Sequence, residues 1–364
     1  MIPVTRPVLP PLDEFVEKLR IIWSSLQLTN DGAMVRELEA SIAKVLGVRH
    51  VIFVSNGTIA IQCAVRAVGM KGRVATTPFS YVATTSALVW EGLEPAFADI
   101  EPGSLTICPS QTEALLKKGA NGVLATHVYG NPCDIDALCT LGERYNVPIV
   151  YDAAHAFGAR YKGRSLCAYG SAATLSFHAT KLFHTVEGGA VVTEDDAVAD
   201  AVRRLRNFGQ SGVDHIDGLG INGKNSEVHA AMGLCLLPRL SDIIRERTML
   251  AEVYSAEIAD CDADVKPISW RDGTIPNYSY YPVVFSSEAA LDRCMQVLAA
   301  SDIRARRYFR PSLSHLPYIR NPNPTPVADS VVNRVLCLPL YSGLDPALAQ
   351  QIAVLVRSSL TVAL

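Results

Sequence analysis

The stretch TLSFHATKLFHTVEGGAVVT, from Thr174 to Thr193, contains more information about fold and chemistry than any other segment of this chain. Its two ends are short apolar runs, Thr174–Phe177 and Ala190–Thr193, which predict two strands. Between them lie Lys181 and the tight turn Glu187-Gly188-Gly189. Because ligands of open α/β sheets bind beyond the carboxyl ends of the strands, the stretch predicts a sheet with a site beside it.

Strand-like and helix-like segments alternate through the first two thirds of the chain. Helical patterns lie between several apolar runs, as at Asp134–Tyr145. The alternation predicts an α/β fold with a mostly parallel sheet that helices cover on both faces. Five further runs predict strands of this sheet: Val51–Val54, Arg73–Thr76, Glu94–Ala98, Gly122–Thr126 and Pro148–Tyr151.

The last third of the chain predicts a smaller α+β domain. A long helical stretch, Ser226–Asp260, is interrupted at Pro238 and leads into it. We therefore divide the 364 residues into a large domain, 1–245, and a small domain, 246–364. The small domain is expected to contain a strand at Tyr281–Phe285, a helix at Ser287–Ala300, a loop at Tyr308–Val327, a strand at Val335–Pro339 and a closing helix at Gln350–Leu364.

Composition limits the classes of protein to which the chain can belong. Apolar residues make up 49% of it and charged residues 19%, which is enough for a sizeable core. A net charge of -3 provides no basic surface for nucleic acid or anionic lipid. The first residues do not resemble a signal peptide, and no apolar run approaches the roughly 20 residues that span a bilayer. We therefore expect a cytoplasmic protein without a nucleic-acid or membrane partner.

The cysteines predict no metal site. They are nine in number and scattered, with no CxxC pair, and the histidines form no pair at ligand spacing. Cys63 and Cys337 lie in apolar stretches and are expected to be buried free thiols.

Two charged residues near predicted strand ends suit the chemistry of pyridoxal 5'-phosphate (PLP). Asp152 ends an apolar strand, with small neighbours, and its carboxylate can pair with a protonated ring nitrogen. Lys181 has apolar neighbours, and desolvation would lower the pKa of its amine and make it a nucleophile toward aldehydes. A helix N-cap is the plainer explanation for Asp152, and a surface position is the plainer one for Lys181.

Three further segments predict groups around the same ligand. The turn from Ser55 to Thr58 leads from a strand into a helix, where backbone amides suit a phosphate. In Pro78-Phe79-Ser80-Tyr81, the aromatic rings can stack on a cofactor or fill the core. His155 is expected one helical turn after Asp152, facing the same pocket, with a core position as the alternative.

Together these motifs resemble those of the DegT/StrS sugar-nucleotide aminotransferases, a family of fold type I PLP enzymes. The resemblance implies a large domain with a mostly parallel seven-stranded sheet covered by helices, and a smaller α+β C-terminal domain. It extends over nearly the whole chain and includes residues 28–32, 55–58, 78–84, 129–132, the run at 152, 176–181 with the glycines at 188 and 189, and 220–222.

The resemblance also implies roles for four residues around the cofactor ring. Lys181 and Asp152 are the catalytic residues: Lys181 forms the Schiff base with PLP, and Asp152 meets the pyridine nitrogen. Tyr81 stacks on the ring face. Many members of the family have glutamine where this chain has His155, but histidine can still donate to the phenolic oxygen.

A second group of residues is implied to hold the cofactor phosphate. Gly57, Thr58 and Ser176 contribute from the same subunit, and Asn222 reaches in from a neighbouring one. A homodimer with a shared active site is therefore expected. The chain departs from the family pattern at Lys224-Asn225, where arginine-methionine is frequent, and in the longer loop 308–315.

The implied activity is a ping-pong transfer of an amino group from L-glutamate to a nucleotide-linked keto-deoxysugar. Residues 7–12, 152–158 and 177–183 look most like a subgroup that converts dTDP-4-keto-6-deoxy-D-glucose into the 4-amino sugar (viosamine type). A 3-aminotransferase acting on a dTDP-3-keto-6-deoxyhexose stays open. The pathway also stays open among the O-antigen of lipopolysaccharide, an antibiotic and a glycoprotein sugar.

Two other functions compete with this one. A sugar dehydratase of the same family is disfavoured, because those enzymes have histidine in place of the Schiff-base lysine and this chain has Lys181. A non-catalytic, PLP-binding regulatory protein is the third candidate. The chain shows no DNA-binding segment or basic arm, and its set of Lys181, Asp152 and Ser176 looks complete for catalysis.

Overall fold

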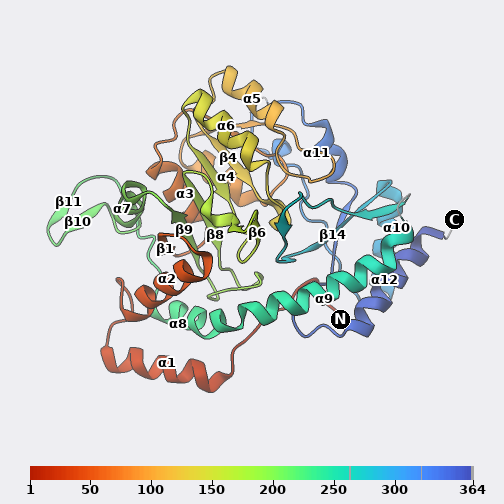
Figure 1. The fold of residues 1–364 in the computed structure, drawn as a ribbon, viewed down its shortest axis with the longest axis horizontal. Coiled ribbons are helices and arrows are strands. Elements are labelled where there is room, and N and C mark those ends of the chain that lie inside the picture. The colour runs from red at the N-terminus through yellow and green to blue at the C-terminus, as the bar shows by residue number, and fades with distance from the viewer. Residues whose placement is uncertain (262–263, 321, 362–364) are drawn as a thin grey trace.

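The computed structural model describes residues 1–261, 264–320 and 322–361 (Figure 1). At its centre is a seven-stranded sheet with the order β1-β9-β8-β5-β4-β2-β3. Only β9 runs antiparallel to its neighbours, so the predicted mostly parallel sheet is confirmed. The strands are β1 (His50–Val54), β2 (Arg73–Thr76), β3 (Glu94–Phe97), β4 (Val123–Thr126), β5 (Ile149–Asp152), β8 (Ala172–Ser176) and β9 (Gly189–Thr193).

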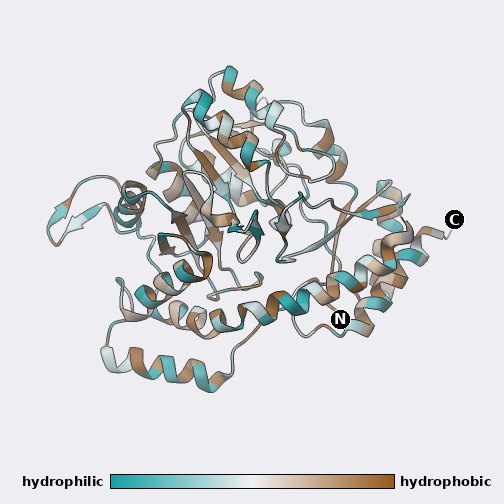
Figure 2. Ribbon diagram, viewed as in Figure 1, coloured by the Kyte–Doolittle hydropathy of each residue, from teal (hydrophilic) through white to brown (hydrophobic). Residues whose placement is uncertain are grey.

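Helices cover both faces of this sheet because strand side chains alternate between them. Along β1, Val51 and Phe53 face one hydrophobic core, and Ile52 and Val54 face the other. Figure 2 shows apolar residues concentrated in the central strands. The first face is covered by α2 (Ala33–Leu46), α5 (Pro109–Lys117), α6 (Ile135–Tyr145) and α8 (Glu227–Leu236); the second by α3 (Gly57–Ala67), α4 (Val82–Trp90) and α7 (Asp196–Leu205). Helix α1 (Leu12–Ser25) packs on α8 and adds Ile22 to the core of the first face.

A further hydrophobic core lies in the C-terminal third of the chain. It is built on the antiparallel sheet β12-β14-β15. Helix α9 follows α8 after a short 3-10 turn that contains Pro238, the predicted interruption. Helix α9 runs unbroken through residues 245 and 246, so no break in secondary structure marks the predicted boundary between the two domains. That boundary stays a prediction. The elements are α9 (Leu240–Ile258), β12 (Val265–Pro267), β14 (Tyr281–Phe285), α10 (Glu288–Ala300), β15 (Val335–Leu338) and α12 (Pro346–Thr361).

The closing helix begins four residues before the predicted Gln350, and the predicted residues 362–364 lie outside the described ones. The N-terminal segment is bound to this same part of the chain. Ile2 N donates to the carbonyl oxygen of Asp302 and Ile2 O accepts from Arg304 N, both at 2.8 Å. Leu340 N donates to the carbonyl oxygen of Val4 at 3.0 Å.

Several short elements were not predicted, because two or three residues are too few to show an alternating pattern. One group is a small sheet of three strands. Another is a hairpin that projects from the body beside α7 (Figure 1). A short helix also begins at the end of the predicted loop Tyr308–Val327. These elements are β6 (Arg160–Tyr161), β7 (Arg164–Ser165) and β13 (Thr274–Ile275), the hairpin β10 (Gln210–Gly212) and β11 (His215–Ile216), and α11 (Pro326–Val331).

Every helix within residues 1–261, 264–320 and 322–361 is too short or too polar to cross a membrane. The cysteine prediction is confirmed for the two thiols it named, since Cys63 and Cys337 are buried and form no disulfide. In the same described ranges, no three His, Cys, Asp or Glu side chains gather as a metal ion would require.

The glycine at the start of β9 lets two backbone segments approach closely. A Cβ on Gly189 would lie 2.5 Å from the carbonyl group of Asn56 and 2.7 Å from the amide nitrogen of Gly57. Real Cβ atoms do not approach backbone so closely. The Glu-Gly-Gly turn therefore allows β9 to pack directly against the turn that begins α3.

We expect Gly189→Ala to lower the free energy of unfolding by about 1–3 kcal/mol, because the added methyl group has no room against rigid backbone. Urea denaturation measures this change. Gly218→Ala is the matched control, since no atom lies within 4 Å of its Cβ position. Equal stability changes in the two variants would contradict the explanation.

Candidate functional site

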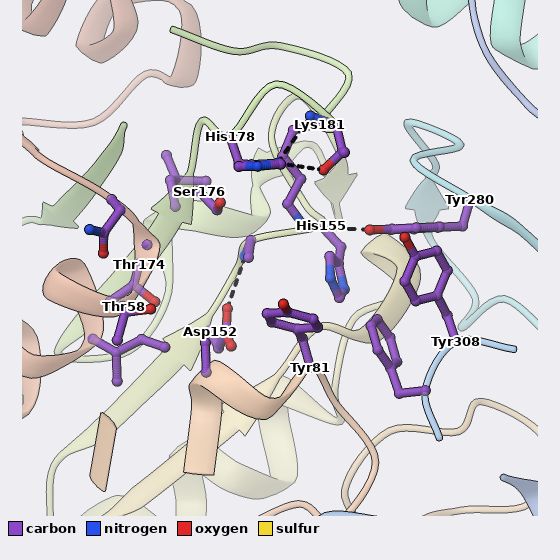
Figure 3. Close-up of a pocket in the computed structure, with 18 of the residues that line it drawn as sticks. Thr58, Tyr81, Asp152, His155, Thr174, Ser176, His178, Lys181, Tyr280 and Tyr308 are labelled. Atoms are coloured by element: carbon purple, nitrogen blue, oxygen red, sulfur yellow. Dashed lines mark hydrogen bonds between the residues drawn. The ribbon is translucent and has the colours of Figure 1, made fainter. Parts of the chain in front are cut away.

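Three strands that run in the same direction end at one edge of the large sheet. Strand β5 ends at Asp152, β8 ends at Ser176, and β1 leads through a short turn into α3, which begins at Gly57. A cavity of about 260 Å³ opens at this edge (Figure 3). Its place agrees with the rule that ligands of open α/β sheets bind beyond the carboxyl ends of the strands.

Most of the residues predicted for the site meet in this cavity. Asn222 is the exception: it is exposed, pairs through its backbone with Asn207 and does not line the cavity of its own chain. Its role in a neighbouring subunit stays a prediction. The predicted residues that line the cavity are Gly57, Thr58, Tyr81, Asp152, His155, Ser176 and Lys181.

The carboxylate of Asp152 is buried and fixed by two hydrogen bonds. The hydroxyl of Thr84, on α4, donates to Oδ2 at 2.6 Å, and the backbone N–H of Ala154 donates to Oδ1 at 3.1 Å. Burial raises the pKa of Asp152, and these donors together with the charge of Lys181 oppose the rise. The residues that follow form turns, so Asp152 is not a helix N-cap.

The prediction that His155 lies one helical turn after Asp152 is wrong. The carbonyl oxygen of His155, which a helix would use, instead accepts from Asn277 Nδ2 at 2.8 Å and from Ser279 Oγ at 2.7 Å. The segment therefore forms turns. His155 and Asp152 nevertheless line the same cavity.

The imidazole of His155 presents an N–H donor to the cavity. Its Nδ1 accepts from the backbone N–H of Tyr129 at 3.3 Å, so the proton of the neutral ring is on Nε2. Burial holds the pKa of His155 well below its usual range, and the ring stays neutral. Stacking on Phe309, with centroids 5.3 Å apart and planes 9° apart, fixes the ring plane. Nε2 is buried and has no partner among the described residues.

The side chain of Lys181 points into the cavity rather than into solvent (Figure 3). Its Nζ donates to the hydroxyl oxygen of Tyr280 at 3.4 Å. Burial lowers the pKa of Lys181 to about 8, although the negative charge of Asp152 partly opposes this shift. At neutral to mildly basic pH, the amine is therefore partly unprotonated and nucleophilic.

Hydroxyl groups and a helix N-terminus meet at another side of the cavity. Asn56 caps α3 by accepting from the N–H of Ile59 at 2.9 Å. A Cβ on Gly57 would lie 2.9 Å from the Cβ of Ser176, so glycine brings the helix start against the end of β8. The buried Oγ1 of Thr174, which also lines the cavity, has no partner in the part of the chain that the structure describes. This arrangement suits an anionic oxygen group.

The two aromatic candidates for stacking take different positions. Phe79 is fully buried in a hydrophobic cluster and fills the core. Tyr81 is 53% exposed, precedes α4 and lines the cavity. Only Tyr81 can therefore contact a ligand there.

The C-terminal third supplies a wall of the cavity that contains no predicted site residue, although Tyr308 and Phe309 lie in the loop 308–315 singled out from the sequence. Tyr280, Arg306, Tyr308 and Phe309 form it (Tyr280 and Tyr308 are labelled in Figure 3). The Arg306 guanidinium lies 4.4 Å from the centre of the Tyr308 ring. The concentration of tyrosines at 278–281 and the aromatic pair at 308–309 were the available signals.

The depressed pKa of Lys181 predicts a pH-dependent stability. Between pH 8 and 10.5, the unfolded chain binds a proton at this lysine that the folded protein has lost, so the free energy of unfolding rises with pH. We expect the wild type to gain at most about 3 kcal/mol over Lys181→Met across this range, and less where water enters the cavity. Urea denaturation at several pH values measures the difference. A difference that falls with increasing pH would contradict the burial of the amine.

The sequence and the fold are similar to those of known aminotransferases. The family model described as "DegT/DnrJ/EryC1/StrS aminotransferase family" matches residues 12–357. A relative from Shigella dysenteriae named dTDP-4-amino-4,6-dideoxy-D-glucose transaminase is 38% identical over 359 residues, which are 97% of this chain and 98% of the relative. An Escherichia coli relative of the same name is 34% identical over 361 residues, with 96% of each chain covered.

A solved structure gives the same fold. The structure titled as DesI in the presence of its TDP-sugar product has a TM-score of 0.92 and is 32% identical. The match covers 98% of this chain and 92% of that one.

Proposed function

We propose that this chain, which belongs to the DegT/DnrJ/EryC1/StrS aminotransferase family, uses PLP to move an amino group from L-glutamate to a keto-deoxysugar nucleotide. The family predicted from the motifs is confirmed, as is the predicted fold class. The observation that carries the proposal is the cavity that holds the desolvated amine of Lys181 together with the buried carboxylate of Asp152.

The residues around the cavity fit PLP. Asp152 retains lone pairs that can accept from the ring N–H, and His155 offers its Nε2–H to the phenolic oxygen. The hydroxyls of Thr58 and Ser176, with the amides at the start of α3, suit the phosphate. A polar ligand would also give partners to Nε2 of His155 and Oγ1 of Thr174, which are otherwise buried and unpaired in the described structure.

When bound, PLP supplies an electron sink for the carbanion at the reacting carbon. Asp152 keeps a proton on the ring nitrogen, which maintains that sink. The neutral amine of Lys181 would hold PLP covalently through its aldehyde. With glutamate bound, the freed amine would act as general base on the α-proton of the donor and would then return that proton as general acid.

The second half of the reaction uses the same groups in reverse. 2-Oxoglutarate leaves before the sugar ketone enters, so a single lysine serves both substrates in turn. We propose dTDP-4-keto-6-deoxy-D-glucose as the ketone and the corresponding 4-amino sugar as the product. The names of the Shigella dysenteriae and Escherichia coli relatives and the TDP-sugar product in the DesI structure support this choice.

We also propose that the enzyme is a homodimer in which Asn222 reaches the cavity of the neighbouring subunit. In support, the segment that contains the β10–β11 hairpin exposes large apolar side chains, which a second subunit would cover. These side chains are Phe208, Val213, Ile216 and Leu219, exposed by 49, 96, 69 and 69%, respectively.

Borohydride reduction tests the covalent role of Lys181. Wild-type protein treated with PLP and borohydride is expected to carry the reduced cofactor at Lys181, as determined by peptide mapping, because this amine is nucleophilic. Lys181→Ala should carry no such label and should fail to turn over more than once. Labelling at another lysine, or multiple turnovers by the variant, would refute the role.

A panel of keto-sugar nucleotides with L-glutamate tests the substrate. We expect amination of dTDP-4-keto-6-deoxy-D-glucose, with the new C–N bond at C4 in the NMR spectrum of the product. Amination of dTDP-3-keto sugars instead would establish the 3-aminotransferase alternative. If the absorption spectrum of the bound PLP aldehyde does not change when glutamate is added, the protein is a regulatory PLP-binding protein.

A further inference from the structure

Tyr280 contacts the amine of Lys181 in the cavity. Among the residues that the structure describes, it is the one side chain within hydrogen-bonding distance of Nζ, at 3.4 Å. Its phenol ring meets four aromatic rings edge-on: His155 at 5.1 Å, Tyr308 at 5.4 Å, Tyr129 at 5.7 Å and Phe309 at 6.4 Å between centroids. The ring is therefore held rigidly. Burial raises the pKa of Tyr280, so its hydroxyl stays protonated and uncharged.

A buried arginine holds the backbone just before Tyr280. Arg247, on α9, is 1% exposed and donates to the carbonyl oxygens of Tyr278 at 3.1 Å and Ser279 at 3.3 Å. No carboxylate within the described residues forms an ion pair with it. Burial of a cation without a carboxylate partner lowers the stability of the fold, and hydrogen bonds to the cation offset part of this cost. Tyr278 has a φ of 45°, in the left-handed region, which is unfavourable for a residue other than glycine and must be stabilised by surrounding contacts.

The same segment also holds His155. Asn277 and Ser279 both donate to the carbonyl oxygen of His155, so this turn and the backbone of Tyr280 move as one unit. One short segment, 277–280, therefore holds the backbone of His155 through Asn277 and Ser279 and places the phenol of Tyr280 against Lys181.

We propose that Tyr280 is a positioning residue for Lys181. Its hydroxyl oxygen accepts from the amine and would hold Nζ in place between the two proton transfers. Arg247 acts through Tyr280 by fixing the backbone of residues 278 and 279. The inference rests on the proposed role of Lys181 as the proton carrier.

The first test replaces the acceptor and retains the ring, in Tyr280→Phe. The full-length protein is freed of PLP with L-cysteine, and the methylation of Lys181 by formaldehyde and cyanoborohydride is measured against pH by peptide mass spectrometry. Without the acceptor, the ammonium form loses stabilisation, so the midpoint should fall by about one pH unit from the wild-type value. The other groups that face the amine, Asp152, Tyr81, His155 and Arg306, are unchanged in this comparison.

Tyr281→Phe is the matched control. Tyr281 is the next residue on β14, and its hydroxyl bonds to that of Ser255 at 2.9 Å, outside the cavity. Its loss should leave the midpoint for Lys181 unchanged. An unchanged or raised midpoint in Tyr280→Phe, or an equal fall in both variants, would overturn the proposal.

Steady-state kinetics of the PLP-loaded enzyme provides the second readout. We expect Tyr280→Phe to lower kcat about tenfold or more, while the KM for glutamate changes less than about threefold, because proton transfer suffers and donor binding does not. A change confined to KM would overturn the positioning role. The methylation midpoint needs only the amine, so it stays informative if wild-type enzyme fails to transaminate, in which case the proposed function itself has failed.

The role of Arg247 is tested by combining a variant of Arg247 with Tyr280→Phe. Arg247→Lys keeps the charge but loses the planar fork of donors, and we expect a smaller downward shift of the same midpoint. If the arginine acts through Tyr280, the double variant should have the midpoint of Tyr280→Phe alone. Additive shifts would show that Arg247 acts on Lys181 by another route and would overturn its assignment.

Discussion

The common direction of three strands in one sheet fixes the relative places of the reacting groups. Strands β1, β5 and β8 run in the same direction, so a helix start, a carboxylate and a hydroxyl arrive at one edge of the sheet. Each of these groups lies at the end of a strand or at the start of a helix, so regular secondary structure fixes its position. Gly57 and Gly189 then let the backbone around α3 close to distances that any side chain would forbid. The paths of the strands and of the start of α3 therefore set the position of the cavity, and the side chains complete its walls.

The cavity also concentrates groups that lower the stability of the fold. A buried carboxylate, a desolvated amine and two buried polar atoms without partners in the described structure all lie around it. Each would be better solvated in the unfolded chain. Such local violations of the rules for a stable core are expected where ligand binding and catalysis take place, and the hydrophobic cores of the large sheet and of the C-terminal third offset them.

Local patterns predict much of this protein, because most of its elements are long enough to show one. The strands Arg73–Thr76 and Tyr281–Phe285 have the predicted bounds, and the groups on the sheet edge follow motifs of a few residues. The turn at His155 was missed because its carbonyl bonds to side chains more than a hundred residues away. Tyr280 was missed for the same reason: its place beside Lys181, 99 residues earlier, depends on how the C-terminal third packs.

The attachment of the first residues to the last third of the chain has a consequence for biosynthesis. Ile2 and Val4 bond to backbone groups at positions 302, 304 and 340. A ribosome makes a chain from its amino end, so residues 2–4 stay without these partners until residues 302–340 have emerged. This early-made segment is therefore among the last to settle into place.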